Sequence, residues 1–381
     1  MNKYVKKYIH KIANDRKIGI FGAGKKSYVA EELLRTIGIY EYVFFDNNQI
    51  AYLGEHNKSI LNVNQITKDY FILISTVYFT EIKKQLDDLG MKEVEDYIWA
   101  LDLEFYDALI HFKDAPRVPN ISMADLAELE LEIAKYVEVK VIDWFDEKDF
   151  LQYENNLGFQ IVYDRMNNAR YRRKIMEYYF VDKLAGFEQW DKDDIYIDVG
   201  AAGSPFVKYL REKKRIKAFG LDLNKGKFSE LPYYLQEDAT NMHFLNNEIS
   251  LISLQSSYET FMKNADIDFI WEAARVLKKG GKVIICPLYL HKQYLSTVSP
   301  NYYCTGNADK DSLECIRVDC RGSLPLGRFY DVNAFYMRVL KNVKQCGLVP
   351  TVYSLPQELV EKDEFVYLKF ILELKKIDDR F

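Results

Sequence analysis

The sequence predicts an α/β protein with two parallel-sheet units joined by a helical connector. Two short apolar runs, 17–21 and 195–199, each lead into a turn that carries glycines. In both parts of the chain, short strands alternate with helical stretches, which favours parallel sheets. A chain of 381 residues is long enough for two or three domains with cores of their own. We expect a smaller α/β unit at 1–115, a helical connector or cap at 116–190 and a larger α/β unit at 191–381.

The composition is that of an ordinary globular protein. The net charge of −5 argues against nucleic acid as a partner, because nucleic-acid binding needs clustered positive surface. No apolar run reaches the roughly 18 residues of a membrane span, and no signal-peptide core follows the charged start. The five cysteines are odd in number and lack Cys-x-x-Cys spacing, which predicts reduced thiols and no metal site. A cytoplasmic protein is therefore expected.

The first unit, 1–115, begins with the strand 17–21 and the turn Gly22-Ala-Gly24. A helix at 27–36 follows, and the next strand ends in Asp46, 22 residues after Gly24. This spacing indicates a nucleotide site, with phosphate at the helix N-terminus and ribose on Asp46. Ser27 stands where a third glycine is expected. The unit resembles Rossmann-like domains found beside sugar-modifying enzymes, which either bind a nucleotide or serve as docking modules, and both readings stay open.

The connector, 116–190, has little glycine punctuation and shows helical spacing. Helices are predicted at 124–137 and 164–184, after a linker at Pro116-Arg-Val-Pro119. These helices are in a position along the chain to cap a pocket of the larger unit.

Acidic residues end three successive strands of the larger unit. Asp198 precedes a turn that carries Gly200 and Gly203, and Asp222 ends the next strand, 24 residues after Asp198. A third apolar piece leads into Glu237-Asp238-Ala239. Carboxyl ends of parallel strands share one edge of a sheet, so the three acids suit a ligand with a ribose and an amino-purine.

These motifs resemble the first three motifs of class I S-adenosylmethionine-dependent methyltransferases. A 17-residue stretch, 269–285, also resembles their helix-turn-strand signature, with Lys279 where proline is usual. The resemblance covers about 190–381 and departs again at Ala202, where many members have glycine. It implies seven strands that end in an antiparallel hairpin, with S-adenosylmethionine as the cofactor.

The resemblance also implies roles for individual residues. Asp198 would hold the turn or the cofactor ammonium, Asp222 would accept both ribose hydroxyls, and Asp238 would accept the adenine amino group. The complete set of expected cofactor contacts is Asp198, Gly200, Ala201, Gly203, Asp222, Leu223, Asp238 and Ala239. For a single aspartate, a helix cap or turn remains the alternative.

Candidate groups for the transfer itself follow the fourth and fifth strands. The loop 255–261 resembles an "S-x-E-H-F" segment of sugar-associated relatives, with Thr260 in the place of the histidine. Glu259 in this loop either orients the substrate or caps the following helix. His291 is the best remaining proton acceptor, because an unperturbed imidazole titrates near neutral pH, and His243 is second.

A long insertion separates the fifth strand from the last two. Its arginine-containing loop predicts substrate contacts at Arg321, Arg328 and Tyr330, since arginine binds phosphate or carboxylate with two parallel bonds. Pairing with Asp319 or Asp331 is the alternative.

The sequence thus predicts a methyltransferase that acts on oxygen or nitrogen of a sugar or other small or carrier-linked molecule, in a bacterial polysaccharide or natural-product pathway. A homo-oligomer is compatible with this reading. The alternatives are a non-catalytic scaffold with the same fold and a nucleotide-sugar oxidoreductase driven by the first unit.

Overall fold

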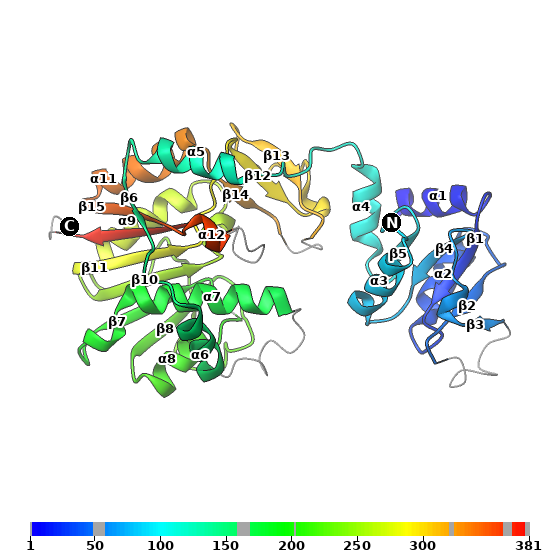
Figure 1. The fold of residues 1–381 in the computed structure, drawn as a ribbon, viewed down its shortest axis with the longest axis horizontal. Coiled ribbons are helices and arrows are strands. Elements are labelled where there is room, and N and C mark those ends of the chain that lie inside the picture. Colours follow the sequence, from blue (N-terminus) through cyan, green and yellow to red (C-terminus); the bar gives the residue numbers. More distant parts are fainter. Residues whose placement is uncertain are drawn as a thin grey trace. The chain divides into compact units, whose positions relative to one another are not determined.

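The computed structural model describes residues 2–48, 58–157, 168–201, 203–319, 324–360 and 368–377. The chain divides into two compact units (Figure 1). One consists of Met1–Pro116, Ser299–Tyr303 and Ile316–Ser323, and the other of Arg117–Val298, Cys304–Cys315 and Leu324–Phe381. Residues 117–190 therefore fold with the C-terminal unit. Among the described residues no helix is both long and apolar enough to span a bilayer.

The N-terminal unit contains a five-stranded parallel sheet in the order β3-β2-β1-β4-β5. This is the order of the first five strands in dinucleotide-binding folds, so the predicted α/β class is confirmed. Apolar side chains of α1, α2 and α4 cover one face of the sheet, and those of α3 cover the other. The strands are β1 Lys17–Phe21, β2 Val43–Phe45, β3 Ile60–Leu61, β4 Tyr70–Ile74 and β5 Tyr97–Trp99. The helices are α1 Lys3–Ile12, α2 Ser27–Thr36, α3 Phe79–Asp88 and α4 Leu103–His111.

Two pieces from late in the chain belong to this first unit. The ring of Tyr303 lies 5.0 Å from that of Phe112, just after α4. The backbone N–H of Ile316 donates to the carbonyl of Pro116 at 2.8 Å. The unit is thus discontinuous in sequence, because the long insertion supplies part of it.

The C-terminal unit contains an eight-stranded sheet in the order β6-β15-β16-β11-β10-β7-β8-β9. Strand β16 runs antiparallel to both β11 and β15, which confirms the predicted terminal hairpin. The strands of this sheet are β6 Glu138–Val141, β7 Ile195–Val199, β8 Lys217–Asp222, β9 Tyr234–Gln236, β10 Ile249–Gln255, β11 Leu277–Cys286, β15 Leu348–Ser354 and β16 Phe370–Lys376.

The eighth strand, β6, was not predicted. It lies in the connector, between the two helices predicted there, and pairs in parallel with β15 at the sheet edge. Its four residues are mostly exposed, and so short a run shows no clear strand periodicity. The preceding helix, α5 Met123–Ile133, ends four residues earlier than expected.

Helices cover both faces of this sheet. In Figure 1, α7 and α8 lie on one side of the sheet and α11 lies on the other. Helix α9 packs against α11 and β11, and α6 packs against α7. The helices not yet given are α6 Glu147–Leu157, α7 Asn168–Ala185, α8 Phe206–Lys213, α9 Ala265–Val276, α10 Val332–Ala334, α11 Lys341–Gln345 and α12 Gln357–Val360.

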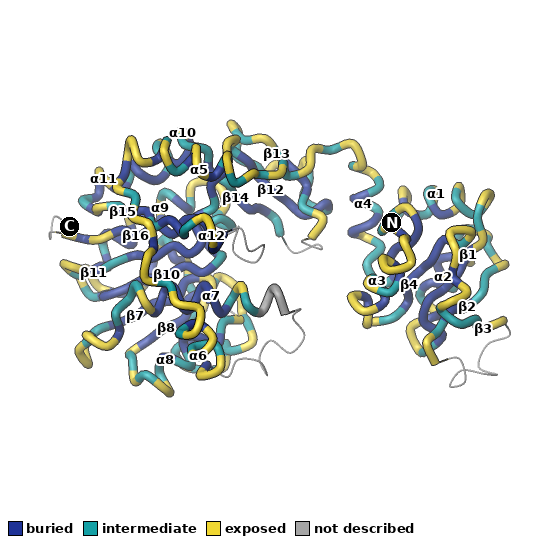
Figure 2. Tube along the Cα trace, viewed as in Figure 1, coloured by how far each residue is buried: buried dark blue, intermediate teal, exposed yellow. Residues whose placement is uncertain are grey.

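The core of this unit follows its two central strands. All five residues of β7 and all seven of β10 are buried, as the dark tube in Figure 2 shows. These strands have helices on both faces, which is why they read as continuous apolar runs in the sequence. The polar residues at their carboxyl ends are therefore held at the boundary of a rigid core.

The insertion after β11 forms a small three-stranded sheet in the order β13-β12-β14. Its strands are β12 Leu295–Val298, β13 Leu313–Ile316 and β14 Gly327–Phe329. A π-helical turn at Phe335–Leu340 connects α10 with α11 and returns the chain to β15.

Candidate cofactor site

The ends of β7, β8 and β10 meet at one edge of the large sheet. Asp198 on β7 is the register partner of Gly220 on β8 and of Ser253 on β10. Just beyond, the N–H groups of Gly200 and Ala201 donate to the carbonyl of Leu221 at 2.8 and 3.1 Å. The bend after β7 is therefore tied to Leu221, the residue that precedes Asp222.

The bend requires glycine at position 200. Gly200 has φ +79°, and a Cβ there would lie 2.5 Å from the Cβ of Ser257. Ser257 itself donates from Oγ to the carbonyl of Val199 at 2.8 Å. The bend thus lies directly against the loop that follows β10. At Gly203, by contrast, an added Cβ would meet none of the described residues within 4 Å, so among these residues the outer part of the bend is not filled by side chains.

Asp198 is a buried carboxylate with an altered acidity. Its side chain is 1% exposed, and burial raises the pKa of Asp198 to about 7. The Ser204 hydroxyl, which donates to Oδ2 at 3.1 Å, and the cation of Lys174 oppose this rise. The negative charges of Glu177 and Asp222 add to it. A positive charge near Asp198 would favour its ionised form and so lower this raised pKa.

Ser204 joins two tyrosines to Asp198. Its Oγ lies 3.1 Å from the hydroxyl of Tyr178 on α7, and its carbonyl accepts from the Tyr234 hydroxyl at 2.5 Å. The ring of Tyr234 also fills the space beside Gly220, where a Cβ would lie 2.7 Å from it. These contacts fix the segment between the glycine bend and α8.

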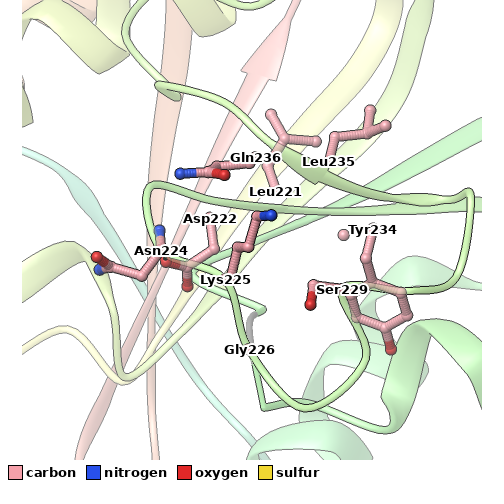
Figure 3. A pocket seen from close by; sticks show the side chains of 10 residues that line it. Leu221, Asp222, Asn224, Lys225, Gly226, Ser229, Tyr234, Leu235 and Gln236 are labelled. Carbon is pink, nitrogen blue, oxygen red and sulfur yellow. Dashed lines mark hydrogen bonds between the residues drawn. The ribbon is translucent and has the colours of Figure 1, made fainter.

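Asp222 lies beside a small pocket of about 60 Å³, shown in Figure 3. Its Oδ1 accepts from the backbone N–H of Asn224 at 2.8 Å. In Figure 3, Asp222, Asn224 and Lys225 line one side of the pocket, and Ser229 and Tyr234 line the other. Cavities that enclose a whole ligand measure about 300–1,000 Å³, so this pocket has room for only part of a cofactor.

The third acidic strand end is also at this edge. The N–H of Glu237 donates to the carbonyl of Asp222 at 3.0 Å, which places β9 beside β8. Asp238 is exposed, and its Oδ1 accepts from both the N–H and the hydroxyl of Thr240 at 2.8 Å. This is the turn-forming role that is the alternative to adenine binding, so the adenine contact stays a prediction. Ala239 is buried, whereas Leu223 is 64% exposed.

The candidate catalytic groups lie after β10 and β11. Glu259 is half-buried in the short 3-10 helix η5, Tyr258–Thr260. His291 is 5% exposed, and burial lowers the pKa of His291. Its ring Nδ1 accepts from the backbone N–H of Gln293 at 3.1 Å, and the backbone N–H of His291 donates to the carbonyl of Tyr330 at 2.9 Å. His243 is exposed and lies 2.7 Å from a Glu237 oxygen.

The structure gives Arg328 and Tyr330 a bracing role in place of the predicted substrate contact. Arg328 is 0% exposed and forms two bonds with Asp309, at 2.5 and 3.0 Å. It also donates to the carbonyls of Phe261 and Lys263 at 2.8 and 3.1 Å. Tyr330 is 1% exposed and donates to the buried Asp266 at 2.8 Å. These donors hold the insertion against η5 and α9. Arg321 lies outside the described residues.

Sequence reasoning did not identify Lys174 and Glu177, which extend from α7 to the same edge. Glu177 is 1% exposed and accepts from Lys174 Nζ at 2.8 Å and from Ser256 Oγ at 2.8 Å. The spacing of a lysine and a glutamate three apart was visible in the sequence, but it usually marks a solvated helix face. Only the packing of α7 shows that this pair faces the sheet.

The glycine turn of the N-terminal unit is braced by its acid. Gly22 has φ +107°, and a Cβ there would lie 3.1 Å from the carbonyl oxygen of Ser75. Asp46 accepts from the N–H of Ala23 at 2.9 Å and from that of Asn48 at 2.8 Å. These bonds serve the turn itself, and nucleotide binding at Gly22, Gly24 and Asp46 stays a prediction.

Of the comparisons with known proteins, the match to a family model agrees with this geometry. Residues 197–285 match the family model of a methyltransferase domain. No curated protein sequence matches the chain. Solved structures similar to it include 1,6-didemethyltoxoflavin-N1-methyltransferase of Burkholderia thailandensis with S-adenosylhomocysteine, at 9% identity and a TM-score of 0.37, covering 69% of this chain and 94% of that one. Another is geranyl diphosphate C-methyltransferase of Streptomyces coelicolor A3(2), also with S-adenosylhomocysteine, at 12% identity and a TM-score of 0.36, covering 68% of this chain and 100% of that one.

The sheet order, the glycine bend and the family match define the class of the C-terminal unit. It is a class I S-adenosylmethionine-dependent methyltransferase domain, and its cofactor is S-adenosylmethionine. The residues at the sheet edge fit this cofactor in two respects. No described residue fills the space beside Gly203, and the Asp198 carboxyl lies buried at the end of β7, next to that bend.

Proposed function

We propose that this protein transfers a methyl group from S-adenosylmethionine to an oxygen or nitrogen atom of a sugar or another small or carrier-linked acceptor. The observation that carries the proposal is the bend at Gly200, tied by two hydrogen bonds to Leu221 and so held beside Asp198 and Asp222. A bare-backbone turn flanked by two carboxylates suits the methionine and ribose parts of the cofactor. The acceptor class rests on the resemblance of the loop 255–261 and of the N-terminal unit to sugar-associated proteins.

The residues at the edge divide the binding task. Asp222 accepts hydrogen bonds from the ribose hydroxyls, and the backbone of Gly200, Ala201 and Gly203 lies along the methionine portion. Asp198 lies behind this bend, where its charge interacts with the ammonium. S-adenosylmethionine supplies an electrophilic methyl group, and the protein aligns the acceptor with it and keeps water out.

Glu259 is a better candidate than His291 for the base that takes the proton from a hydroxyl group as this group is methylated. In neutral histidine one ring nitrogen accepts and the other carries the proton. Because Nδ1 of His291 accepts from Gln293, its Nε2 carries the hydrogen and is a donor. Glu259 lies in η5, and η5 begins directly after Ser257. The side chain of Ser257 lies against the glycine bend.

Calorimetric titration with S-adenosylhomocysteine tests the cofactor assignment. Wild-type protein should bind it, and Asp222→Ala should weaken binding by about tenfold or more, since a hydrogen bond to a charged group contributes about 1.5–3 kcal/mol. Asp125→Ala is a matched control, because Asp125 caps α5 through Ser122. Absence of binding by the wild type would refute the proposal.

The acceptor is tested separately, with labelled S-adenosylmethionine and a panel of nucleotide sugars. Transfer should be lost in Glu259→Gln while S-adenosylhomocysteine still binds. Binding of S-adenosylhomocysteine without transfer to any acceptor in a broader small-molecule panel would favour the non-catalytic scaffold. The sequence observation that favours the scaffold is Thr260, which stands in the place of a histidine base.

A further inference from the structure

Helix α7 reaches the edge of the sheet with a buried carboxylate. Glu177 is 1% exposed, and its two oxygens have different partners. One accepts from Lys174 Nζ at 2.8 Å, and the other accepts from Ser256 Oγ at 2.8 Å. Lys174 also donates to the carbonyl of Gln255 at 3.2 Å. Lys174 and Glu177 on α7 therefore bind Gln255, the last residue of β10, and Ser256 after it.

Ser256 has a backbone conformation that serine rarely adopts. Its φ is +50°, in the left-handed region. A side chain at such a position is strained, so the conformation persists only where surrounding contacts impose it. Two contacts do so for Ser256: its N–H donates to the carbonyl of Cys286 at 3.1 Å, and its hydroxyl donates to Glu177.

The direction of the chain after Ser256 decides where the next residues lie. Ser257 follows at once, and its Cβ occupies the space beside Gly200. Thr260 Oγ1 donates to the carbonyl of Ser257 at 2.7 Å, which closes the η5 turn that carries Glu259. A change in the backbone at Ser256 would therefore move both Ser257, which packs against Gly200, and the η5 turn, which carries Glu259.

We propose that Glu177 is a positioning residue of this site: through Ser256 it holds the turn between β10 and η5 in its left-handed form, against the bend at Gly200. This inference rests on the proposed cofactor function, because it names a residue that shapes the same site. It does not require Glu177 or Ser256 to touch the cofactor.

Substitutions at Ser256 separate positioning from direct contact. Ser256→Ala keeps a Cβ but loses the hydroxyl that Glu177 holds, and it should weaken S-adenosylhomocysteine binding by about tenfold. Ser256→Gly also loses the hydroxyl, but glycine adopts this conformation without strain, so its binding should stay near the wild-type value. Equal losses in both variants, or no loss in either, would overturn the proposal.

Glu177 has a matched control on the same helix. Asp182 is 4% exposed and lies 2.7 Å from Lys214 Nζ, much as Glu177 lies 2.8 Å from Lys174 Nζ. Glu177→Ala should weaken binding more than Asp182→Ala does. In the double variant Glu177→Ala with Ser256→Gly, most of the loss should be recovered, because the tether is no longer needed. Additive losses would contradict the mechanism.

Amide hydrogen exchange of the protein alone keeps this inference distinct from the cofactor assignment. Glu177→Ala should speed exchange in the segment 256–261, and Asp182→Ala should not. If the wild type binds no S-adenosylhomocysteine, the proposed function fails, yet the exchange experiment still decides whether Glu177 holds the turn. Unchanged exchange in Glu177→Ala would overturn the inference whatever the binding result.

Discussion

Replacing Asp198 by asparagine should change how the stability of the C-terminal unit depends on pH. Asp198 is buried, and burial raises the pKa of its carboxyl from 3.8 to about 7. Asparagine has nearly the same shape and accepts from Ser204 in the same way, but it cannot ionise. The difference between the two proteins therefore reports the cost of the buried negative charge.

The sign follows from proton binding. Below pH 3.8 the carboxyl is protonated in both states, and its contribution to stability is fully present. As the pH rises toward 7, the unfolded chain releases the proton while the folded protein keeps it, so stability falls until the folded state also ionises. The whole change corresponds to about 4 kcal/mol. Between pH 5.5 and pH 8 the wild type should lose about 2 kcal/mol relative to Asp198→Asn.

Urea unfolding of both proteins at several pH values, followed by tryptophan fluorescence, measures this difference. Asp125→Asn is the control, because the Ser122 hydroxyl and then the Ser122 backbone hold the pKa of Asp125 at about 2, and it is ionised throughout this range. Its difference from the wild type should not vary with pH. A constant difference for Asp198→Asn as well would refute the reasoning, since the carboxyl would then titrate alike in both states.

Two further predictions concern backbone space and a buried charge. Gly200→Ala should lower the free energy of unfolding by about 2–3 kcal/mol, because the added Cβ would collide with Ser257 at a left-handed φ. Gly203→Ala is the control and should change this free energy by less than about 1 kcal/mol. Thermal unfolding of the two variants and the wild type measures the difference. Arg328→Met should cost about 3–5 kcal/mol, since it leaves Asp309 buried without its arginine. Adding Asp309→Asn should restore part of that loss in urea unfolding, and a purely additive double variant would show that the pair is not coupled.

The sequence was sufficient for the features that depend on local pattern. Asp198, the glycines after it and Asp222 stand at strand ends, and parallel strands bring such ends to one edge. The family match and the sheet order confirm the methyltransferase fold that these motifs resemble. The terminal hairpin of β15 and β16 was expected from the family resemblance, and the antiparallel pairing of the two strands confirms it.

Features that depend on packing were beyond sequence reasoning. Arg328 looked like a substrate clamp because arginines in glycine-rich loops often bind anions. Its partner Asp309 lies 19 residues away, and no periodicity connects the two. Glu177 was missed because a charged residue on a helix is usually solvated, and only the position of α7 against β10 and β11 shows that it is buried. The edge strand β6 was missed because four mostly exposed residues carry too weak a pattern.

The N-terminal compact unit cannot be separated from the rest of the chain by one cut. It includes Ser299–Tyr303, which lies more than 180 residues beyond its own boundary at Pro116. A fragment that ends at Pro116 would lack the aromatic partner of Phe112, and a fragment that begins at Arg117 would carry Tyr303 without it. Any attempt to express the two halves independently must therefore decide which half keeps Ser299–Tyr303, and a single cut after Pro116 separates the rings of Phe112 and Tyr303.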